Sequence, residues 1–231
     1  MITEALRYPR ESDDVVMVLF LGGILGFFGF LLFPLIFVFG YLLNVLRRTM
    51  AGDDTLPAFE NWEGLFMDGL KVFVVTFVYG LVPSIFGGGI VLVGSIGVAT
   101  DPNSPVGVLF ILLGALLWIV LGLAMAYLIP AALANVAKKD TYGAGFDFSL
   151  IWSAVTTGTY LTGWLYAFAI LVGASIVVSV LNVIPGLGVL IGPFVMFYAS
   201  ISAYYVIGHT WAELTPVGVD RGDTSGEQAT I

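Results

Sequence analysis

Long apolar stretches, separated by short polar segments, run along most of the chain. Each stretch exceeds the roughly 20 residues that an α-helix needs to cross a bilayer. The five stretches are residues 15–46, 69–99, 106–137, 157–183 and 189–211. Hydrophobic residues make up 59% of the chain and charged residues only 10%, against about 25% charged residues in a soluble domain. The pattern predicts an all-α polytopic transmembrane helix bundle, with residues 15–213 as a single transmembrane domain.

The first stretch decides between five and six spans. At 1.5 Å per residue it would be roughly 48 Å long, against about 30 Å for the hydrocarbon core. Pro34 lies near its middle. Either one long helix kinks at Pro34, or two short helices meet there as a hairpin, which gives six spans. Residues 32–35 include no polar turn residue, and an unpaired turn in lipid is costly, which favours the single kinked helix.

The basic residues indicate the orientation. Six of the eight fall at the same ends of the spans: Arg47, Arg48, Lys71, Lys138, Lys139 and Arg221. By the positive-inside rule this end is cytoplasmic, in a cell membrane, and so is the C-terminus. The two outer turns, residues 101–105 and 181–188, have no basic residue. Arg7 and Arg10 join the cytoplasmic side only in the hairpin, because five spans place the N-terminus outside.

Two polar segments flank the transmembrane domain. Residues 1–14 form a polar N-terminal segment, and residues 214–231 an acidic tail whose composition predicts disorder. The net charge of −8 predicts a halophilic source, because excess carboxylate keeps a surface solvated in concentrated salt. We expect no nucleic-acid partner for so acidic a chain.

Two segments at the end of the spans that carries the basic residues share the same arrangement of residues. Residues 56–66 place Phe59, Trp62 and Phe66 on one helical face, as in an amphipathic helix that lies in the membrane interface. Residues 146–152 look like a second copy. Each copy follows a span that contains proline and ends in a basic pair. The sequence therefore predicts two interfacial amphipathic helices and a weak internal repeat of residues 15–96 and 106–183, although any inner loop of this kind would give a similar pattern.

Ionisable residues are absent from the middle of every predicted span. Ion-coupled carriers and enzymes usually place such residues in a central cavity, so we expect no enzyme and no catalytic residue. Asp68 and Lys71 can pair at the start of the second span, as an anchor of its register. His209 and Glu213, at (i, i+4) spacing, are candidates for a weak pH-sensitive site. One histidine and no cysteine predict no common zinc site and no cofactor.

The remaining candidates for a hinge or a polar site are weaker. Residues that can bend a span are Pro34, Pro83 and Gly88. The last two are candidates for a helix break of the kind that lines substrate sites in transporters. Hydroxyl groups gather at the start of the fourth span, at Thr156, Thr159 and Tyr160. They suit helix packing better than a narrow polar path. Gly22 and Gly26 form a small-residue face that can seat another helix of this chain or a second copy.

Short motifs spread over the chain resemble a known family. They are Tyr8-Pro9-Arg10, Gly40-Tyr41, Leu56-Pro57 with Trp62, Leu65-Phe66, Asp68-Gly69-Leu70-Lys71, Pro130, Phe146-Asp147, Gly192-Pro193 and Phe197-Tyr198. In combination they resemble the archaeal membrane family catalogued as domain of unknown function 4013, over residues 5–213. The resemblance implies an integral membrane protein, often from haloarchaea. It implies no activity, ligand or functional residue.

We therefore expect an uncharacterised multi-pass membrane protein without enzymatic activity. Its expected role is that of a scaffold that organises the membrane or binds partners. The expected partners are the lipid bilayer and, through small-residue helix faces, a second copy or another membrane protein. The alternative is a transporter or channel for a neutral or hydrophobic solute.

Overall fold

The computed structural model describes residues 1–10 and 14–215, and within them it is helical, without a strand. In chain order the helices are α1 (Ile2–Arg7), α2 (Val15–Phe27), α3 (Phe33–Met50), α4 (Trp62–Pro83), α5 (Gly89–Thr100), α6 (Pro105–Lys139), α7 (Phe148–Val155), α8 (Gly158–Leu181) and α9 (Leu187–Leu214). A π-helical turn, Ser84–Gly88, joins α4 to α5. Beyond residue 215, the predicted acidic tail and Arg221 lie outside the described residues.

Five helices in the described part of the chain are long and apolar enough to cross a membrane, which agrees with the predicted number of spans. They are Phe33–Met50, Trp62–Thr100, Pro105–Lys139, Gly158–Leu181 and Leu187–Leu214. The last four coincide with predicted stretches. The first begins much later than predicted, because α2 does not belong to it.

The prediction of a single kinked helix at Pro34 is wrong. The chain breaks at Leu32, which has a φ of 63°, and Pro34 lies in the first turn of α3, where proline is favoured. The turn needs no polar side chain because Leu32 N donates to Gly29 O at 2.9 Å and Leu35 N donates to Leu32 O at 3.1 Å. With 13 residues, α2 is about 20 Å long, and residues 2–10 and 15–31 count as a sixth candidate span only as a pair bent by 97°. Helix α2 packs across α9.

The N-terminal segment lies beside the C-terminal half of α9. The Tyr8 ring stacks on Tyr205, with centroids 4.4 Å apart, and Met1 lines the same cavity as His209 and Glu213. The five-span prediction placed the N-terminus at the opposite end from these residues. The structure corrects this, because α1 and the turn after it pack near the end of α9 that carries the C-terminus.

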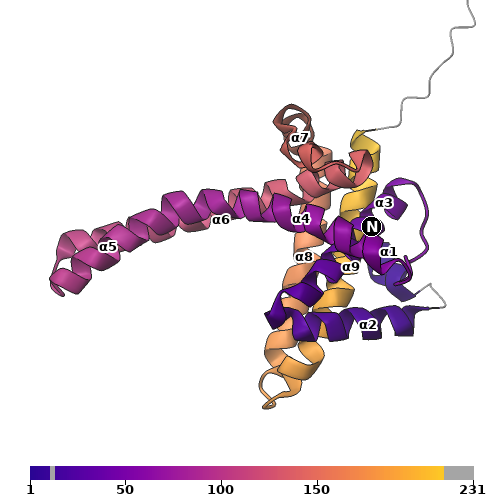
Figure 1. Cartoon of the computed structure of the whole chain (residues 1–231), viewed down its shortest axis with the longest axis horizontal. Helices are drawn as coiled ribbons and strands as arrows, with labels where there is room; N and C mark the ends of the chain where they lie inside the picture. The colour runs from indigo at the N-terminus through magenta and orange to yellow at the C-terminus, as the bar shows by residue number, and fades with distance from the viewer. Residues whose placement is uncertain (11–13, 216–231) are drawn as a thin grey trace, which may run out of the picture.

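Two helical hairpins diverge from a common body (Figure 1). Helix α5 and the adjoining half of α6 form an arm that points left in Figure 1, whereas α8 and α9 point downward. The body lies where α3, α4, α6 and α9 meet, and buried apolar side chains fill it: Leu43, Leu46, Val75, Leu133, Val136 and Trp211. Close packing of the arm relies on glycine, since a Cβ on Gly114 would lie 2.6 Å from Val91 N.

Glycines also let α3 and α4 approach at backbone distance. A Cβ on Gly40 would lie 1.9 Å from Leu65 O, and one on Gly69 would lie 1.8 Å from Ile36 O. Likewise, α9 occupies the predicted small-residue face of α2: Gly22 lies against the Phe197 ring and Gly26 against Pro193. That face therefore seats another helix of this chain.

The first predicted amphipathic helix is not a separate element. Residues 56–61 contain no helix, and Trp62 opens α4. The aromatic side chains pack on α3 because its own aromatic residues face them: Phe59 stacks on Tyr41 with centroids 4.4 Å apart, and Trp62 meets Phe37 at 5.4 Å. The second predicted segment, residues 146–152, overlaps the short helix α7, with Trp152 exposed.

The two halves of the predicted repeat pack differently. The helices of the first half, α3 and α4, are in close contact. In the second half, hydrogen bonds join α6 to α8 through Tyr160 and Trp164, which donate to the carbonyl oxygens of Tyr127 and Ala126. The repeat stays a prediction.

Candidate functional site

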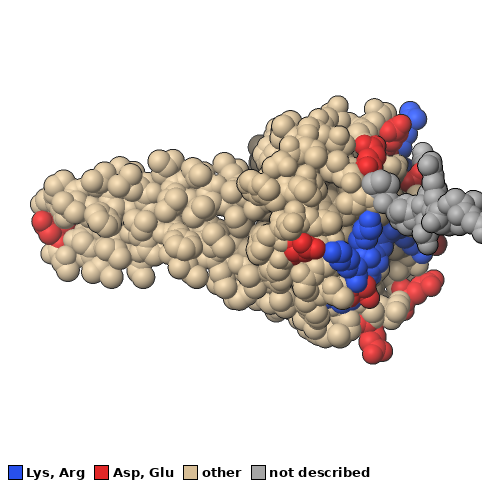
Figure 2. Space-filling model, turned by 90° about the horizontal axis from the view of Figure 1, so that it is seen from above, with Lys and Arg blue, Asp and Glu red and all other residues tan. Residues whose placement is uncertain are grey.

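Charged side chains gather at the end of the molecule opposite the tip of the arm (Figure 2). Along the arm, Asp101 is the only charged residue between Val72 and Ala137. Charged side chains are therefore concentrated where α3, α4 and α6 end or begin.

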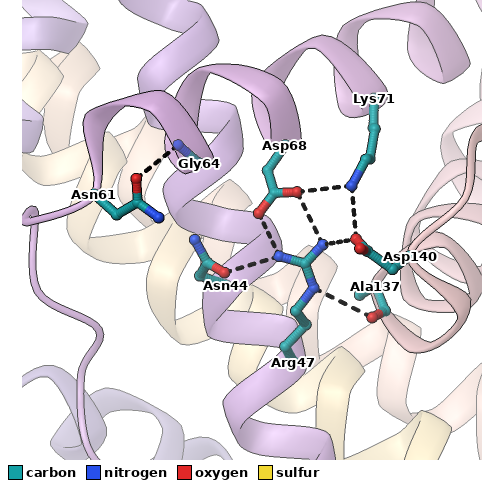
Figure 3. A network of polar contacts seen from close by, with 8 residues as sticks. All are labelled: Asn44, Arg47, Asn61, Gly64, Asp68, Lys71, Ala137 and Asp140. Atoms are coloured by element: carbon teal, nitrogen blue, oxygen red, sulfur yellow. Dashed lines mark hydrogen bonds and ion pairs between the residues drawn. The ribbon is translucent and has the colours of Figure 1, made fainter.

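The centre of this region is the guanidinium of Arg47 (Figure 3). Its Nη1 and Nη2 donate to the two carboxylate oxygens of Asp68, the second at 2.9 Å. Nη1 also donates to Asn44 Oδ1 at 2.9 Å, and Nε to Ala137 O at 3.3 Å. Such a bidentate pair is both strong and specific in direction. One side chain thus joins α3 to α4 and to the last turn of α6.

Asp140 and Lys71 close the network. Lys71 Nζ lies 3.1 Å from Asp68 Oδ1 and 2.6 Å from Asp140 Oδ1, and Arg47 Nη2 also donates to Asp140 Oδ1. The Asp68 and Lys71 side chains are only 11% and 13% exposed, whereas that of Asp140 is 66% exposed. The predicted pairing of Asp68 with Lys71 is confirmed, and two more residues extend it.

Local structure explains why these side chains meet. Arg47 lies in the last turn of α3, where a cation complements the helix dipole. Asp68 and Lys71 lie three residues apart and so on one face of α4. Asp140 caps α6 in a left-handed conformation, with φ 55°, and its N–H donates to Val136 O. That conformation turns the chain at the helix end and presents the carboxylate to both cations.

The electrostatics of the network favour a structural role. Two cations face two carboxylates, so the charges balance. The hydrogen bond from Lys71, with the positive charge of Arg47, holds the pKa of Asp140 below its usual range. Carboxylates held ionised in this way are poor general acids or bases near neutral pH. What the arrangement does well is fix the ends of three helices in one geometry.

The predicted pair of His209 and Glu213 lines a separate cavity of about 310 Å³, together with Met1 and Glu4. His209 Nδ1 lies 3.3 Å from Tyr205 O, one turn earlier on α9. Its Nε2 lies 3.8 Å from Asp54 Oδ1. The structure thus adds Asp54 and Glu4 to the acidic groups near this histidine, which the (i, i+4) pattern alone could not show.

The hydroxyl groups near the start of α8 bond mainly to nearby backbone. Thr156 Oγ1 donates to Trp152 O at 2.9 Å, and the buried Tyr160 donates to Tyr127 O on α6 at 2.8 Å. Thr159 is exposed. Of these three hydroxyl groups, only that of Tyr160 bonds another helix, and helix packing stays a prediction for the other two.

The predicted hinge residues lie at helix junctions. Pro34 lies in the first turn of α3, and Pro83 ends α4 just before the π-helical turn that contains Gly88. The helix continues through that turn into α5, so it bulges there and does not break. A Cβ on Gly88 would meet open space.

Sequence reasoning missed two members of the network. The sequence indicates Arg47 only as one of the cations that mark one side of the membrane, and it indicates no role for Asp140. Asp140 directly follows the basic pair Lys138-Lys139. A single acidic residue at the end of a span is therefore the signal that could have indicated it. Nothing in the sequence says which distant cation it meets.

The apolar helices and the single charged end define the class of this protein: an α-helical membrane protein with several membrane-spanning helices. The chain matches the family model described as Protein of unknown function (DUF4013) over residues 18–183. It belongs to that family, as the resemblance of its motifs implied. No curated protein and no solved structure gives a match.

Proposed function

We propose that this protein is a non-enzymatic scaffold of the cell membrane that binds another membrane protein or a second copy along its α5–α6 arm. The observation that carries the proposal is the isolation of that arm. Helix α5 packs on α6 and on the π-helical turn, and the arm stands clear of the other helices in Figure 1. Large apolar side chains cover it: Leu92, Val93, Ile96, Leu112, Leu116 and Ile119 are all more than half exposed.

Packing of small residues favours a protein partner on part of this surface. Helices associate in lipid by close van der Waals contact, which small residues permit. A Cβ on Gly88, Gly89 or Gly122 would meet nothing within 4 Å, so these positions can take the side chains of a partner helix. The small residues of the arm would then seat a partner helix, as Gly22 and Gly26 of α2 seat α9.

The charged end supports a fixed scaffold and disfavours an enzyme. Its Arg47 network ties three helices together, and its carboxylates are held by cations. The positive-inside rule places this end, with the C-terminus, in the cytoplasm. The acidic balance of the chain and the motifs of the family support a halophilic archaeal source.

One observation favours the alternative, a transporter or channel for a neutral or hydrophobic solute. The π-helical turn Ser84–Gly88 lies within the span that includes Pro83, and such turns are frequent at functional sites. The scaffold stays the first proposal because ionisable groups are absent from the arm on either side of that turn, apart from Asp101.

Affinity purification of the full chain in mild detergent tests the scaffold. We expect an oligomer or a defined co-purifying membrane protein, and the variant Gly122→Leu should weaken that association because it fills an open position on the arm. The matched variant Gly173→Leu, on α8, should leave it unchanged. Consistent recovery of the chain alone, as a monomer, would reject the proposal.

A further inference from the structure

A polar cavity of about 360 Å³ lies between the last turns of α3 and the first turns of α4, and the loop that joins these helices forms its third side. Asn44 and Arg48 lie four residues apart and therefore face it together from α3. Asn61, the N-cap of α4, lines it from the other side. Arg47 and Asp68 also line it, so the cavity lies at the charged end of the molecule, beside the ion-pair network.

Two carboxamide groups present unused donors to this cavity. Asn44 Oδ1 accepts a hydrogen bond from Arg47 Nη1, and Asn61 Oδ1 accepts one from Gly64 N, both at 2.9 Å. These bonds fix the orientation of each amide, because only its oxygen can accept. Both Nδ2 groups therefore point into the space between the helices (Figure 3). Within residues 1–10 and 14–215, neither Nδ2 donates a hydrogen bond to another residue.

Arg48 adds a guanidinium group to the same cavity. Its Nη1 donates to Thr55 Oγ1 at 2.7 Å and lies 3.4 Å from Asp53 Oδ2. In the part of the chain that the structure describes, its Nε and Nη2 have no hydrogen-bond partner. The side chain is 41% exposed, so these two groups are accessible to a ligand.

Two carboxylates line the cavity as well. The charge of Asp68 is compensated, because its oxygens accept hydrogen bonds from Arg47 and Lys71. Glu60 is exposed and forms no ion pair among the described residues, so its charge opposes an anionic ligand. Three side chains with unused donors thus face one uncompensated carboxylate. The cavity is complementary to a ligand that offers several acceptor oxygens.

We propose that this cavity binds a phosphate group, carried by a small phosphate ester or by a lipid head group, through Asn44 Nδ2, Asn61 Nδ2 and Arg48. A phosphate ester has three terminal oxygens and can accept from three side chains at once, whereas a carboxylate has two. Guanidinium groups are frequent phosphate ligands. Trp62, next to Asn61, is 43% exposed, as expected near the membrane interface, where both sources are present. The site does not depend on the partner proposed for the α5–α6 arm.

Thermal unfolding of the full chain in detergent tests the site, because a ligand that binds the folded state raises the unfolding midpoint. The probes are sodium phosphate, sodium acetate at the same ionic strength, short-chain phosphatidic acid and the matching diacylglycerol, which has no phosphate. We expect a rise with sodium phosphate, with phosphatidic acid or with both, and none with the other two probes. A rise with phosphatidic acid alone would identify a lipid head group as the ligand. No rise with either phosphate probe, or equal rises with acetate or diacylglycerol, would overturn the proposal.

Two isosteric substitutions remove the unused donors and keep the structural bonds. Asn44→Asp and Asn61→Asp retain the oxygen that accepts from Arg47 or from Gly64 N, and aspartate is as good an N-cap as asparagine. Both variants should therefore fold, which the midpoint without ligand verifies. Each should weaken phosphate binding at least about tenfold, since a hydrogen bond to a charged group contributes that much. The control Asn103→Asp adds the same charge at the exposed turn between α5 and α6 and should leave binding unchanged.

Glu60 gives a prediction of the opposite sign. Glu60→Gln removes the opposing charge at an exposed position, so it should strengthen phosphate binding, whereas Arg48→Gln should weaken it. Phosphate binding that is unchanged in Asn44→Asp and Asn61→Asp, or weaker in Glu60→Gln, would contradict the proposal. An equal loss in Asn103→Asp would also contradict it, because net charge alone would then explain the effect.

Discussion

Arg47 and Asp68 lie 21 residues apart in the chain and form a bidentate ion pair that joins the end of α3 to the beginning of α4. Arg47 also donates to Asp140, which links the pair to the end of α6. Since the α5–α6 arm starts from this body, the ion pair fixes the root of the arm. Apolar packing alone gives little directional control in lipid, because lipid tails are as apolar as the side chains.

Removal of the carboxylate should therefore destabilise the protein. Asp68→Asn leaves Arg47 and Lys71 with the exposed carboxylate of Asp140 in place of two shared carboxylates, and Asp68 is 11% exposed. Breaking a fully buried pair costs about 3–5 kcal/mol. Arg47 is 26% exposed, so we expect a smaller loss, of about 1–3 kcal/mol, measured by thermal unfolding in detergent. Asp53→Asn removes a pair that is more than 40% exposed on both sides and should cost less than about 1 kcal/mol. Equal effects of the two substitutions would contradict a structural network.

The backbone contact between α3 and α4 gives a sharper prediction. In Gly69→Ala the new Cβ would lie 1.8 Å from Ile36 O, which no side-chain rotation relieves. We expect a loss of about 3 kcal/mol, or failure to fold. In Gly80→Ala, on the same helix, the Cβ meets nothing within 4 Å. Stability should then be unchanged or higher by up to about 1 kcal/mol. Comparable losses in both variants would mean that the helices do not pack face to face as described.

The network should also respond to acid. The pKa of Asp140 is lowered by the hydrogen bond from Lys71 and by Arg47. A carboxylate with a lower pKa in the folded state adds stability above its unfolded pKa, about 3.9, and loses it as pH falls through the folded value. Unfolding midpoints should therefore fall more steeply below about pH 4 in the natural chain than in Asp140→Asn. The effect is small, since the side chain is 66% exposed. Parallel pH profiles would show that Asp140 is not engaged.

The spans could be predicted because each depends on a local property of the sequence, a long apolar run. The sequence offers the break at Leu32 only as the alternative hairpin at Pro34, because residues 32–35 contain no polar turn residue and the turn is satisfied by its own backbone bonds. Tertiary contacts hold α2 away from α3, since the rings of Phe194 and Phe197 on α9 pack against Gly23 and Gly22. Such contacts, between residues about 170 positions apart, leave no local pattern.

The same limit applies to the candidate site. Asp68 and Lys71 could be paired from their spacing, because three residues on a helix define a common face. Arg47 and Asp140 approach them across 21 and 69 residues, and the sequence has no periodicity that joins them. The predicted interfacial helix at residues 56–66 failed for a related reason, since its aromatic residues found partners on α3 in place of lipid.

The position of the N-terminus can be tested directly, because the chain has no cysteine. Single cysteines at Thr3, Asp54 and Asp101 would report on three exposed sites in intact cells, through a membrane-impermeant maleimide. Since Tyr8 donates to Thr55 O at 3.2 Å and stacks on Tyr205, we expect Thr3→Cys and Asp54→Cys to be equally protected. Asp101→Cys, at the far tip of the arm, should react. All three should react after solubilisation in detergent. If Thr3→Cys reacts together with Asp101→Cys, the first apolar stretch crosses the membrane as one helix and α1 does not pack on α9.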